Sequence, residues 1–444
     1  MQTPLHICWL RRDLRLHDQA ALFEALKSGP TVALFIFDRE ILDRLEDRDD
    51  ARVQFIHQTL NQLALDIASA GGTLITRYGH PLTVWKTLLE EFPIAAVYAN
   101  HDYEPYAIQR DKDIKTLLNQ RGIGFHTFKD QVIFEKDEVL SATGKPYTVY
   151  TPYSKTWLKK LENTYYLKSY PTEKYFHHWH RMPLYHGVVP LEVMEFKSVP
   201  TRFPSVVPPV ERIKKYEETR NYPALDATSH LGIHLRFGTL SVRQLAAQTA
   251  ALSHTYLKEL IWREFFAQIL WHYPKVVQHA FKPAYDNIAY RNAPEDFAAW
   301  CEGKTGYPLV DAGMRELAAT GFMHNRVRMV TGSFLTKHLL IDWRLGEAWF
   351  ARKLLDFDLA SNNGNWQWVA GTGCDAAPYF RIFNPDSQAQ TFDGKAAYIA
   401  KWVPEYQSLT YQSQRIVPHA FARQRALDTY KMALKGEPGP GDQP

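Results

Sequence analysis

The fold class of the N-terminal part is decided by residues 6–37, HICWLRRDLRLHDQAALFEALKSGPTVALFIF. Two short apolar runs, at 6–10 and 31–37, flank a stretch at 18–29 in which apolar residues recur at helical spacing before a glycine. A strand, a helix of crossover length and a second strand predict two parallel strands joined by a helix.

The same alternation continues to about residue 130. Further strands are expected at 73–78, 95–100 and 124–128, and further helices at 50–72, 81–92 and 106–122. This pattern predicts a doubly wound α/β domain with a mostly parallel sheet over residues 1–130. Neither GxGxxG nor GxxxxGK[ST] follows the first strand, so the common phosphate-binding loops are absent from the sequence.

Residues 131–203 are expected to form a long connector, because Pro, Tyr, Lys and His accumulate there without a sustained period. Three of the histidines, His177, His178 and His180, lie close together. No cysteine or carboxylate stands at ligand spacing from them, so we predict surface or interdomain histidines and no metal site.

Residues 204–444 are expected to form an all-α domain. Apolar residues recur every three or four positions in six stretches, at 241–253, 256–274, 309–321, 324–341, 346–361 and 420–434. The predicted fold class is therefore a doubly wound α/β domain followed by an all-α domain.

The composition favours a two-domain chain that folds without disulfides. The 444 residues are 45% hydrophobic, and three distant cysteines, Cys8, Cys301 and Cys374, form no CxxC pair. No apolar run is long enough to cross a bilayer, so we expect a soluble protein of the reducing cytoplasm. The net charge of +4 is mild, whereas the 14% aromatic content supplies surfaces that can stack on bases or on a planar cofactor.

Two of the predicted helices carry unusual polar faces. In KELIWREFF, the residues Glu259, Trp262, Arg263 and Phe266 fall on one face of a helix, although a solvated ion-pair face would explain the charges equally well. In HNRVRM, the three residues Asn325, Arg328 and Met329 share a face, while Arg326 points elsewhere.

The stretch SNNGNWQWVAGTGCDAAPYF, residues 361–380, is poor material for an ordinary core helix, because Asn and Gly lower helix propensity and buried Trp needs a partner for its N–H. Asp356 and Asp358 precede it, and buried acids need partners such as Arg263 or Arg328. Salt bridging alone does not explain the neighbouring amides and indoles.

A phosphate seat is expected near Thr228 and Ser229. These hydroxyls stand at the start of a predicted helix, close in sequence to Tyr216 and Arg220. Free N–H groups and hydroxyls at a helix N-terminus suit a phosphate, although a plain N-cap would need only one of these residues. Together with the carboxylates, amides and indoles, this seat suggests a bound flavin dinucleotide.

At these residues the sequence resembles the photolyase/cryptochrome flavoproteins, and within them the bacterial, class I-like DNA photolyases for cyclobutane pyrimidine dimers. The similarity is carried by WLRRDLRLHDQAAL (9–22), TGYPLVDAGMREL (305–317), MHNRVRMVTGSFLTKHLLIDWR (323–344) and DLASNNGNWQWVAGTGCDAAPYFRIFNP (358–385). The resemblance implies an N-terminal α/β antenna domain, a connector and a helical domain that encloses FAD.

The resemblance also assigns roles by position. Positions that match the FAD pocket are Tyr216, Thr228, Ser229, His230, Leu231, Gly232, Arg263, Asn325, Arg328, Asp356, Asp358 and Asn362, the last beside flavin N5. Positions that match the catalytic lesion pocket are Glu259, which contacts the carbonyl groups of the dimer, and Asn362, Met329, Trp262 and Trp368. Positions that match DNA contacts are Arg220, Glu259, Trp262, Asn325, Arg326, Met329, Trp368 and Arg381.

The implied activity is light-driven repair of DNA. Excited, reduced FAD gives an electron to the dimer, the cyclobutane ring splits and the electron returns. The target nucleotides must leave the duplex, and phosphate contacts should make binding weaken with salt. The implied partner is DNA containing pyrimidine dimers, and we expect a monomer with no obligate protein partner and no membrane attachment.

The sequence departs from the family pattern at three positions. Trp366 and Trp343 match the inner two members of the aromatic chain that reduces oxidised flavin, but Tyr290 stands where the outer member is usually Trp. Either Tyr290 or a neighbour such as Trp349 would end the chain. Gly232 replaces a frequent Ser, and Ala107 stands where folate-binding members carry Glu. The antenna remains open between a deazaflavin, which we slightly favour, methenyltetrahydrofolate, another flavin and no second chromophore.

The main alternative is a cryptochrome-type blue-light receptor without repair activity. Plant-type members tend to lose the lesion-contacting Glu and Met and to carry Asp beside N5, whereas Glu259, Met329 and Asn362 are all present. A (6-4) photolyase is disfavoured because His324 is not part of an HxxxH-like pattern. A non-catalytic nucleic-acid-binding module would not need this set of acids, amides and indoles.

Overall fold

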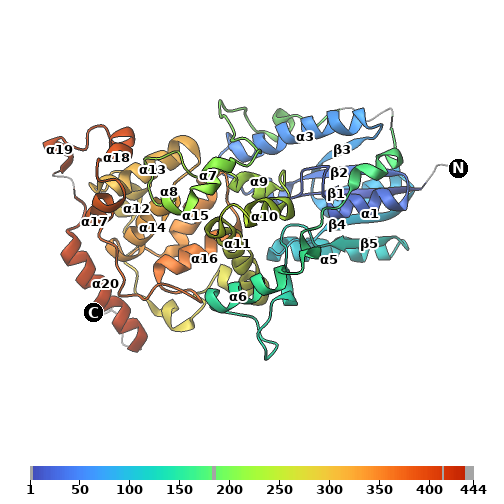
Figure 1. The fold of residues 1–444 in the computed structure, drawn as a ribbon. Coiled ribbons are helices and arrows are strands. Elements are labelled where there is room, and N and C mark those ends of the chain that lie inside the picture. The colour runs from blue at the N-terminus through green and yellow to red at the C-terminus, as the bar shows by residue number, and fades with distance from the viewer. Residues whose placement is uncertain (1–3, 183–186, 413–414, 436–444) are drawn as a thin grey trace. The chain divides into compact units, whose positions relative to one another are not determined.

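The computed structural model describes residues 4–182, 187–412 and 415–435, which fold into two compact units (Figure 1). The first unit comprises the described residues of Met1–Glu138, Trp157–Pro208 and His230–Ala251. The second comprises those of Val139–Thr156, Pro209–Ser229 and Leu252–Pro444. The three ranges predicted from the sequence, 1–130, 131–203 and 204–444, are consecutive along the chain. Each observed unit, in contrast, combines three separate segments of the chain.

The first unit contains the predicted parallel sheet. Its strands are β1 (Leu5–Leu10), β2 (Thr31–Asp38), β3 (Leu74–Gly79), β4 (Ile94–Asn100) and β5 (Gly124–Phe128). They pair in the order β3-β2-β1-β4-β5, and every pairing is parallel. All eight residues of β2 are buried, as expected of a strand covered on both faces. The expected doubly wound sheet is confirmed.

Helices connect the strands and pack against them. They are α1 (Ala20–Ser28), α2 (Arg39–Leu42), α3 (Ala51–Ser69), α4 (Pro81–Glu91) and α5 (Pro105–Asn119). Helix α1 packs against β1 and β4, α3 and α4 against β3, and α5 against β5. The four longer helices lie within a few residues of the ranges predicted from their periodicity.

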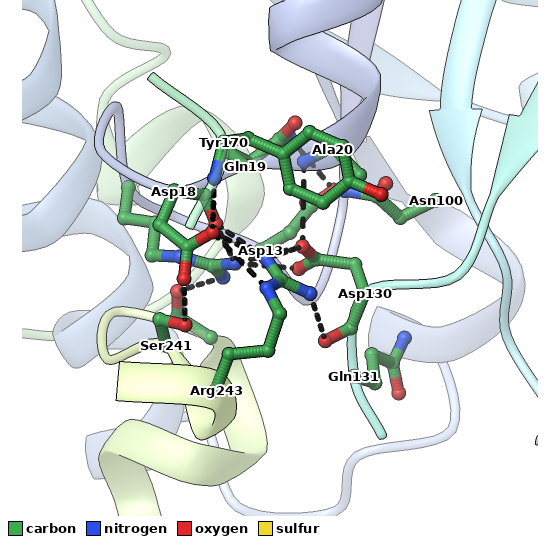
Figure 2. A network of polar contacts seen from close by, with 12 residues as sticks. Asp13, Asp18, Gln19, Ala20, Asn100, Asp130, Gln131, Tyr170, Ser241 and Arg243 are labelled. Atoms are coloured by element: carbon green, nitrogen blue, oxygen red, sulfur yellow. Dashed lines mark hydrogen bonds and ion pairs between the residues drawn. The ribbon is translucent and has the colours of Figure 1, made fainter. Parts of the chain in front are cut away.

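A buried ionic network ties a later segment of the chain into the first unit (Figure 2). Helices α9 (Gly232–Phe237) and α10 (Val242–Ala250) belong to this unit. Arg243 of α10 contacts Asp18 at 3.0 Å and Asp130 at 2.8 Å, and Arg15 contacts Asp130 at 2.8 Å. Asp18 also accepts a hydrogen bond from Ser241. The network therefore joins α10 to the loops that follow β1 and β5.

The second unit is helical, as predicted. Its longer helices are α11 (His254–His272), α12 (Pro294–Cys301), α13 (Pro308–Thr320), α14 (Asn325–Ser333), α15 (Trp343–Lys353), α16 (Leu359–Ala370), α17 (Pro385–Phe392) and α20 (His419–Lys435). Its shorter ones are α7 (Val210–Lys214), α8 (Tyr216–Thr219), α18 (Ala397–Trp402) and α19 (Leu409–Gln412). Helix α6 (Tyr150–Leu161) begins in this unit and continues into the first.

Short helices of other types complete the fold. The 3-10 helices are η1 (Lys136–Glu138), η2 (Thr164–Leu167), η3 (Thr172–His178), η4 (Leu191–Met194), η5 (Pro274–Val277) and η6 (Pro283–Asn287). A π-helical segment, η7 (Phe334–His338), extends α14 within the stretch predicted as one helix over 324–341. In the described residues, no helix combines the length and apolar character needed to cross a membrane.

One helical expectation was wrong in detail. The stretch 346–361 is not one helix: α15 ends at Lys353, and α16 begins at Leu359 after Asp358, whose side chain accepts from the backbone N–H of Ser361 at 3.0 Å. An aspartate in this extended position caps the helix that follows it. Conversely, the Asn- and Gly-rich residues that follow do form α16, which ends before Gly371 in the left-handed region at φ 86°.

Candidate active site in the helical unit

The second unit contains a pocket of about 350 Å³ built from helices α11, α14, α15 and α16. Its lining mixes flat aromatic side chains with acids, amides and guanidinium groups. The lining residues are Arg220, Glu259, Trp262, Arg263, Phe266, Asn325, Arg328, Met329, Gly332, Phe350, Leu354, Asp356, Phe357, Asp358, Ser361, Asn362, Asn365, Trp366, Trp368 and Val369. Polar groups that converge in an apolar cavity are typical of a ligand site.

Helix α11 presents one predicted face to this pocket. Its N-cap, Ser253, accepts from the backbone N–H of Tyr256 at 3.2 Å, which fixes where the helix begins. Glu259, Trp262 and Arg263 then line the pocket together with Phe266 one turn later. The shared face expected from their spacing is confirmed.

The carboxylate of Glu259 is paired with Arg220. The Arg220 guanidinium donates to Glu259 Oε1, and the two side chains are 27% and 32% exposed. Burial raises the pKa of Glu259, and Arg220 opposes this effect only in part. A carboxyl group in this position can take up a proton more readily than one in water.

Helix α14 supplies a second polar face. Asn325, Arg328 and Met329 line the pocket, and Arg328 forms an ion pair with Asp356 at 3.0 Å. Arg328 also donates from Nε to the backbone oxygen of Met323 at 2.7 Å, which holds the guanidinium in place. The expected pairing of an acid from 356–358 with an arginine from another helix is confirmed for this pair.

Arg326 lies on another face of α14, as expected, and does not line the pocket. Its Nη2 donates to Asn221 Oδ1 at 2.7 Å, and its guanidinium lies 4.2 Å from the centre of the Phe392 ring. Arg381 is exposed, beyond the end of α16. The predicted DNA contacts thus comprise residues of the pocket and two arginines outside its lining.

On helix α16, the amide of Asn362 is held by Glu347 of α15. The Asn362 Nδ2 group donates to Glu347 Oε1 at 2.8 Å and to the Glu347 backbone oxygen at 3.1 Å. Both amide protons have acceptors, so the carbonyl oxygen Oδ1 is the group that remains for a ligand. Burial raises the pKa of Glu347, and the bond from Asn362 opposes that rise.

The predicted aromatic chain lies partly in the pocket and partly in the core beneath it. Trp366 lines the pocket, Trp343 is 1% exposed in the main hydrophobic core, and Tyr290 packs against that core. The Trp366 ring centre is 4.9 Å from Phe350 and 6.2 Å from Trp300. Burial of Tyr290, with Tyr430 adjacent, raises its pKa well above the usual tyrosine value.

Two family models match this chain. Residues 6–173 match DNA photolyase, and residues 256–434 match the FAD binding domain of DNA photolyase. The chain is 34% identical to a deoxyribodipyrimidine photo-lyase of Agrobacterium fabrum, with 98% of this chain and 99% of the relative covered. It is 35% identical to that of Escherichia coli, with 97% and 99% covered. The chain belongs to the DNA photolyase family.

A solved photolyase structure shares the fold of this family member. The crystal structure of a bacterial class III photolyase from Agrobacterium tumefaciens matches with a TM-score of 0.85 at 32% identity, and the match covers 98% of each chain. The photolyase/cryptochrome architecture expected from the sequence is confirmed.

The pocket of this photolyase suits FAD by the chemistry of its side chains. Every lining residue except Arg220 falls within the matched FAD-binding domain. A flavin needs flat apolar surfaces for its ring system and both donors and acceptors along its polar edge. Trp366 and Phe350 supply surfaces, and the amides of Asn325 and Asn362 supply donors and acceptors beside the Arg328–Asp356 pair.

The residues of the predicted phosphate seat have a different local structure from the one expected. Thr228 and Ser229 do not start a helix, because α9 begins at Gly232 with Leu231 as its N-cap and no side-chain cap. Ser229 accepts from the hydroxyl of Tyr256 at 2.9 Å, and the Tyr216 ring lies 5.1 Å from that of Tyr256. His230 adopts a left-handed φ of 54°, and with Leu231 and Gly232 it opens a segment of the first unit.

No local pattern of the sequence indicated the roles of Glu347, Tyr256 and Tyr150, which contact the proposed site residues Asn362, Ser229 and Trp262. Each of these contacts joins residues that are far apart in the sequence. Glu347 lies fifteen residues before Asn362, Tyr256 lies twenty-seven after Ser229, and Tyr150 stacks on Trp262 from the predicted connector.

Candidate metal ligands are also accounted for within the described residues. No group of three or more His, Cys, Asp or Glu side chains there could hold a metal ion. His178 Nδ1 lies 2.6 Å from the backbone oxygen of Leu26, and the rings of His177 and His178 are 4.2 Å apart.

Proposed function

We propose that this chain is a light-dependent DNA repair enzyme, a deoxyribodipyrimidine photo-lyase that binds UV-induced cyclobutane pyrimidine dimers and splits them. One observation carries the proposal: Glu259, Met329 and Asn362, together with Trp262 and Trp368, line a single pocket in the FAD-binding domain. When bound in its reduced form, FAD supplies an electron on absorbing light and takes it back after the ring has split.

Glu259 is the group proposed to meet the carbonyl oxygens of the dimer. Burial favours its protonated form, and a protonated carboxyl can donate to an oxygen on which negative charge develops. Arg220, its partner, can turn to the DNA backbone or remain as a second donor. The pair thus offers a proton and a positive charge at the same place.

Three side chains are proposed to form the walls that receive the dimer. Trp262 and Trp368 offer flat surfaces, and Met329 fills irregular space with a flexible thioether. A damaged pair of bases stacks poorly in the duplex, so extruding it costs less than extruding intact bases. Damaged bases should therefore enter the pocket between these walls more readily than undamaged ones.

Asn362 is proposed to accept a hydrogen bond from the flavin. Glu347 occupies the amide protons, so Oδ1 can accept from a ring N–H, and a neutral amide brings no competing charge. Arg263, Arg328, Asp356, Asp358 and Asn325 are proposed to hold the remainder of the ring system. The phosphate end is proposed to be held by Tyr216, Thr228, Ser229, His230, Leu231 and Gly232.

The rim of the site is proposed to bind the DNA backbone through Arg220, Arg326 and Arg381. Phosphate contacts give affinity without sequence preference and weaken with salt. A chain from Trp366 through Trp343 to Tyr290 is proposed to restore reduced flavin. Ala107 is 4% exposed in α5 and supplies no carboxylate for a folate, so we keep a deazaflavin as the proposed antenna. A cytoplasmic monomer remains our proposal for the state of the protein.

The proposal is tested by illuminating the reduced protein with an oligothymidine that contains cyclobutane dimers. Wild type should restore absorbance at the thymine band in the light and not in the dark. Glu259→Gln should bind the dimer about tenfold more weakly, because its amide N–H is a weaker hydrogen-bond donor than a carboxyl O–H and cannot pass on a proton. Glu302→Gln, on an exposed side chain, is the matched control and should leave repair unchanged.

The FAD content of the wild-type protein decides how a failure to repair the dimer is interpreted. If wild type binds FAD but leaves the dimer intact in the light, repair is excluded and the chain is a blue-light receptor on the photolyase fold. If Glu259→Gln binds and repairs as wild type does, the role assigned to Glu259 is wrong.

A further inference from the structure

Tyr150 lies against the proposed lesion wall, although it comes from the predicted connector. Its ring is stacked on that of Trp262, with the centres 3.6 Å apart and the planes at 3°. Aromatic pairs in proteins are usually farther apart, at 4.5–7 Å between centres. At this distance and angle the tyrosine ring lies flat against one face of the indole.

Tyr150 is itself fixed at both ends. Its hydroxyl donates to the backbone oxygen of Lys258 on α11 at 2.9 Å, and its backbone N–H donates to Asp375 Oδ2 at 2.9 Å. Its residue exposure is 9%. Because Lys258 lies one turn before Trp262 on the same helix, the tyrosine is anchored to the element that carries the indole.

The indole is also supported from within α11. Phe265 contacts the Trp262 ring edge-on with the centres 5.6 Å apart, and Phe266 lies at 5.5 Å and 30°. Burial raises the pKa of Tyr150, and Glu259 adds to that rise, so Tyr150 also lies within the electrostatic reach of the proposed catalytic acid. The tyrosine thus completes a rigid support behind Trp262.

We propose that Tyr150 is a positioning residue for the dimer: it holds Trp262 in the one orientation that forms the wall of the lesion pocket. The inference rests on the proposed function, because it needs Trp262 to face a bound dimer. A side chain that is already fixed loses no rotational freedom when the dimer binds, so pre-organisation should appear as affinity for the lesion. Undamaged DNA, which does not enter the pocket, should gain nothing from it.

In this proposal the aromatic ring of Tyr150, and not its hydroxyl, holds Trp262 in place. Tyr150→Phe keeps the stack, so its affinity for a dimer-containing oligonucleotide should stay within about twofold of wild type. Tyr150→Leu removes the stack and should weaken that affinity about three- to tenfold. In both variants, the affinity for an oligonucleotide of the same sequence without a dimer should not change. The FAD content of the protein should not change either. Tyr150→Met, whose unbranched and flexible side chain can adapt to the vacated space, is the second variant should the leucine variant fail to fold.

A double-mutant cycle with Trp262 decides whether Tyr150 acts through the indole. Adding Tyr150→Leu to Trp262→Leu should cost no further affinity, because the wall that Tyr150 supports is already gone. Equal losses in the two backgrounds would overturn the inference, as would unchanged dimer affinity in Tyr150→Leu. A loss shared equally by damaged and undamaged DNA, together with lost FAD, would show a purely structural role and overturn it too.

The wild-type arm distinguishes failure of this inference from failure of the proposed function. If wild type has no preference for dimer-containing over undamaged DNA, the proposed function fails. If wild type has that preference and Tyr150→Leu keeps it in full, the proposed function stands and the role of Tyr150 is wrong.

Discussion

Glu347 determines which way the Asn362 amide points. Asn and Gln side chains present a donor at one end and an acceptor at the other, and an amide with no fixed partner can offer either to a ligand. By taking both protons of Asn362, Glu347 leaves only the acceptor. The function of the asparagine is therefore set by a residue on the neighbouring helix.

The partly buried carboxyl of Glu347 should make the stability of the protein depend on pH. Its pKa is raised in the folded protein, so folding favours the protonated form, and that contribution is lost as pH rises above about 4.3, the usual value for Glu. Glu347→Gln keeps an oxygen that accepts from Asn362 but never ionises. We expect its melting temperature to exceed that of wild type by a margin that grows from pH 5 to pH 8, measured by thermal unfolding.

A surface glutamate provides the control with the opposite sign. Lys214 lowers the pKa of Glu211, so the ionised form is favoured by folding and its contribution is gained as pH rises. The melting temperature of Glu211→Gln should therefore not rise relative to that of wild type between pH 5 and pH 8. A melting-temperature difference for Glu347→Gln that stays constant over this range would show that Glu347 does not titrate as inferred.

At the scale of elements, the pocket depends on how closely α11 and α16 approach. Gly364 of α16 lies against the Phe266 ring of α11, and a Cβ added at Gly364 would overlap Cδ1 of that ring. The glycine costs helix stability, about 1 kcal/mol relative to alanine. The gain is that Phe266 and Asn362, from different helices, line one pocket.

Gly364→Ala should therefore destabilise the protein despite its better helix propensity. Overpacking of this kind costs about 1–3 kcal/mol, and the helices must shift to relieve it, so FAD retention should fall with stability. Gly332→Ala is the matched control: its added Cβ would lie 3.1 Å from Val369 Cγ2, a contact that a small rotation relieves. Urea unfolding measures the stability of both variants, and the FAD content of purified Gly364→Ala measures FAD retention. Equal stabilities for the two variants would show that the approach of α11 and α16 does not depend on Gly364.

The elements themselves were largely predictable, because periodicity reports the buried face of each strand and helix. All five strands and the shared faces of α11 and α14 follow from local spacing. The break between α15 and α16 does not follow from local spacing, because apolar spacing continues across it and only the cap at Asp358 marks where α16 begins. The contacts of Glu347 and Tyr150 join distant segments, so no window of sequence contains them.

At the scale of the whole molecule, charge buried in the first unit holds together segments that are far apart in the chain. Asp18 and Asp130 are 1% and 2% exposed, and Arg243 and Arg15 are 5% and 8% exposed. Burial opposes ionisation of Asp130, but Arg15 and Arg243 outweigh it and lower its pKa. Residues 230–251, which sequence analysis assigned to the helical domain, thus belong to the α/β unit because α10 supplies the counter-charge.

Removing that counter-charge should be far more costly than removing a surface one. Arg243→Met would leave Asp18 and Asp130 buried with one cation fewer, and breaking a buried pair in this way costs about 3–5 kcal/mol. Arg39→Met, which breaks the exposed Arg39–Asp43 pair in the same unit, should leave the urea midpoint nearly unchanged. The deficit of Arg243→Met should shrink as pH falls towards 4 and below, because a protonated Asp130 no longer needs a cation. If Arg243→Met and Arg39→Met unfold at the same urea concentration at pH 7, the network does not hold α10 in place, and apolar packing alone must do so.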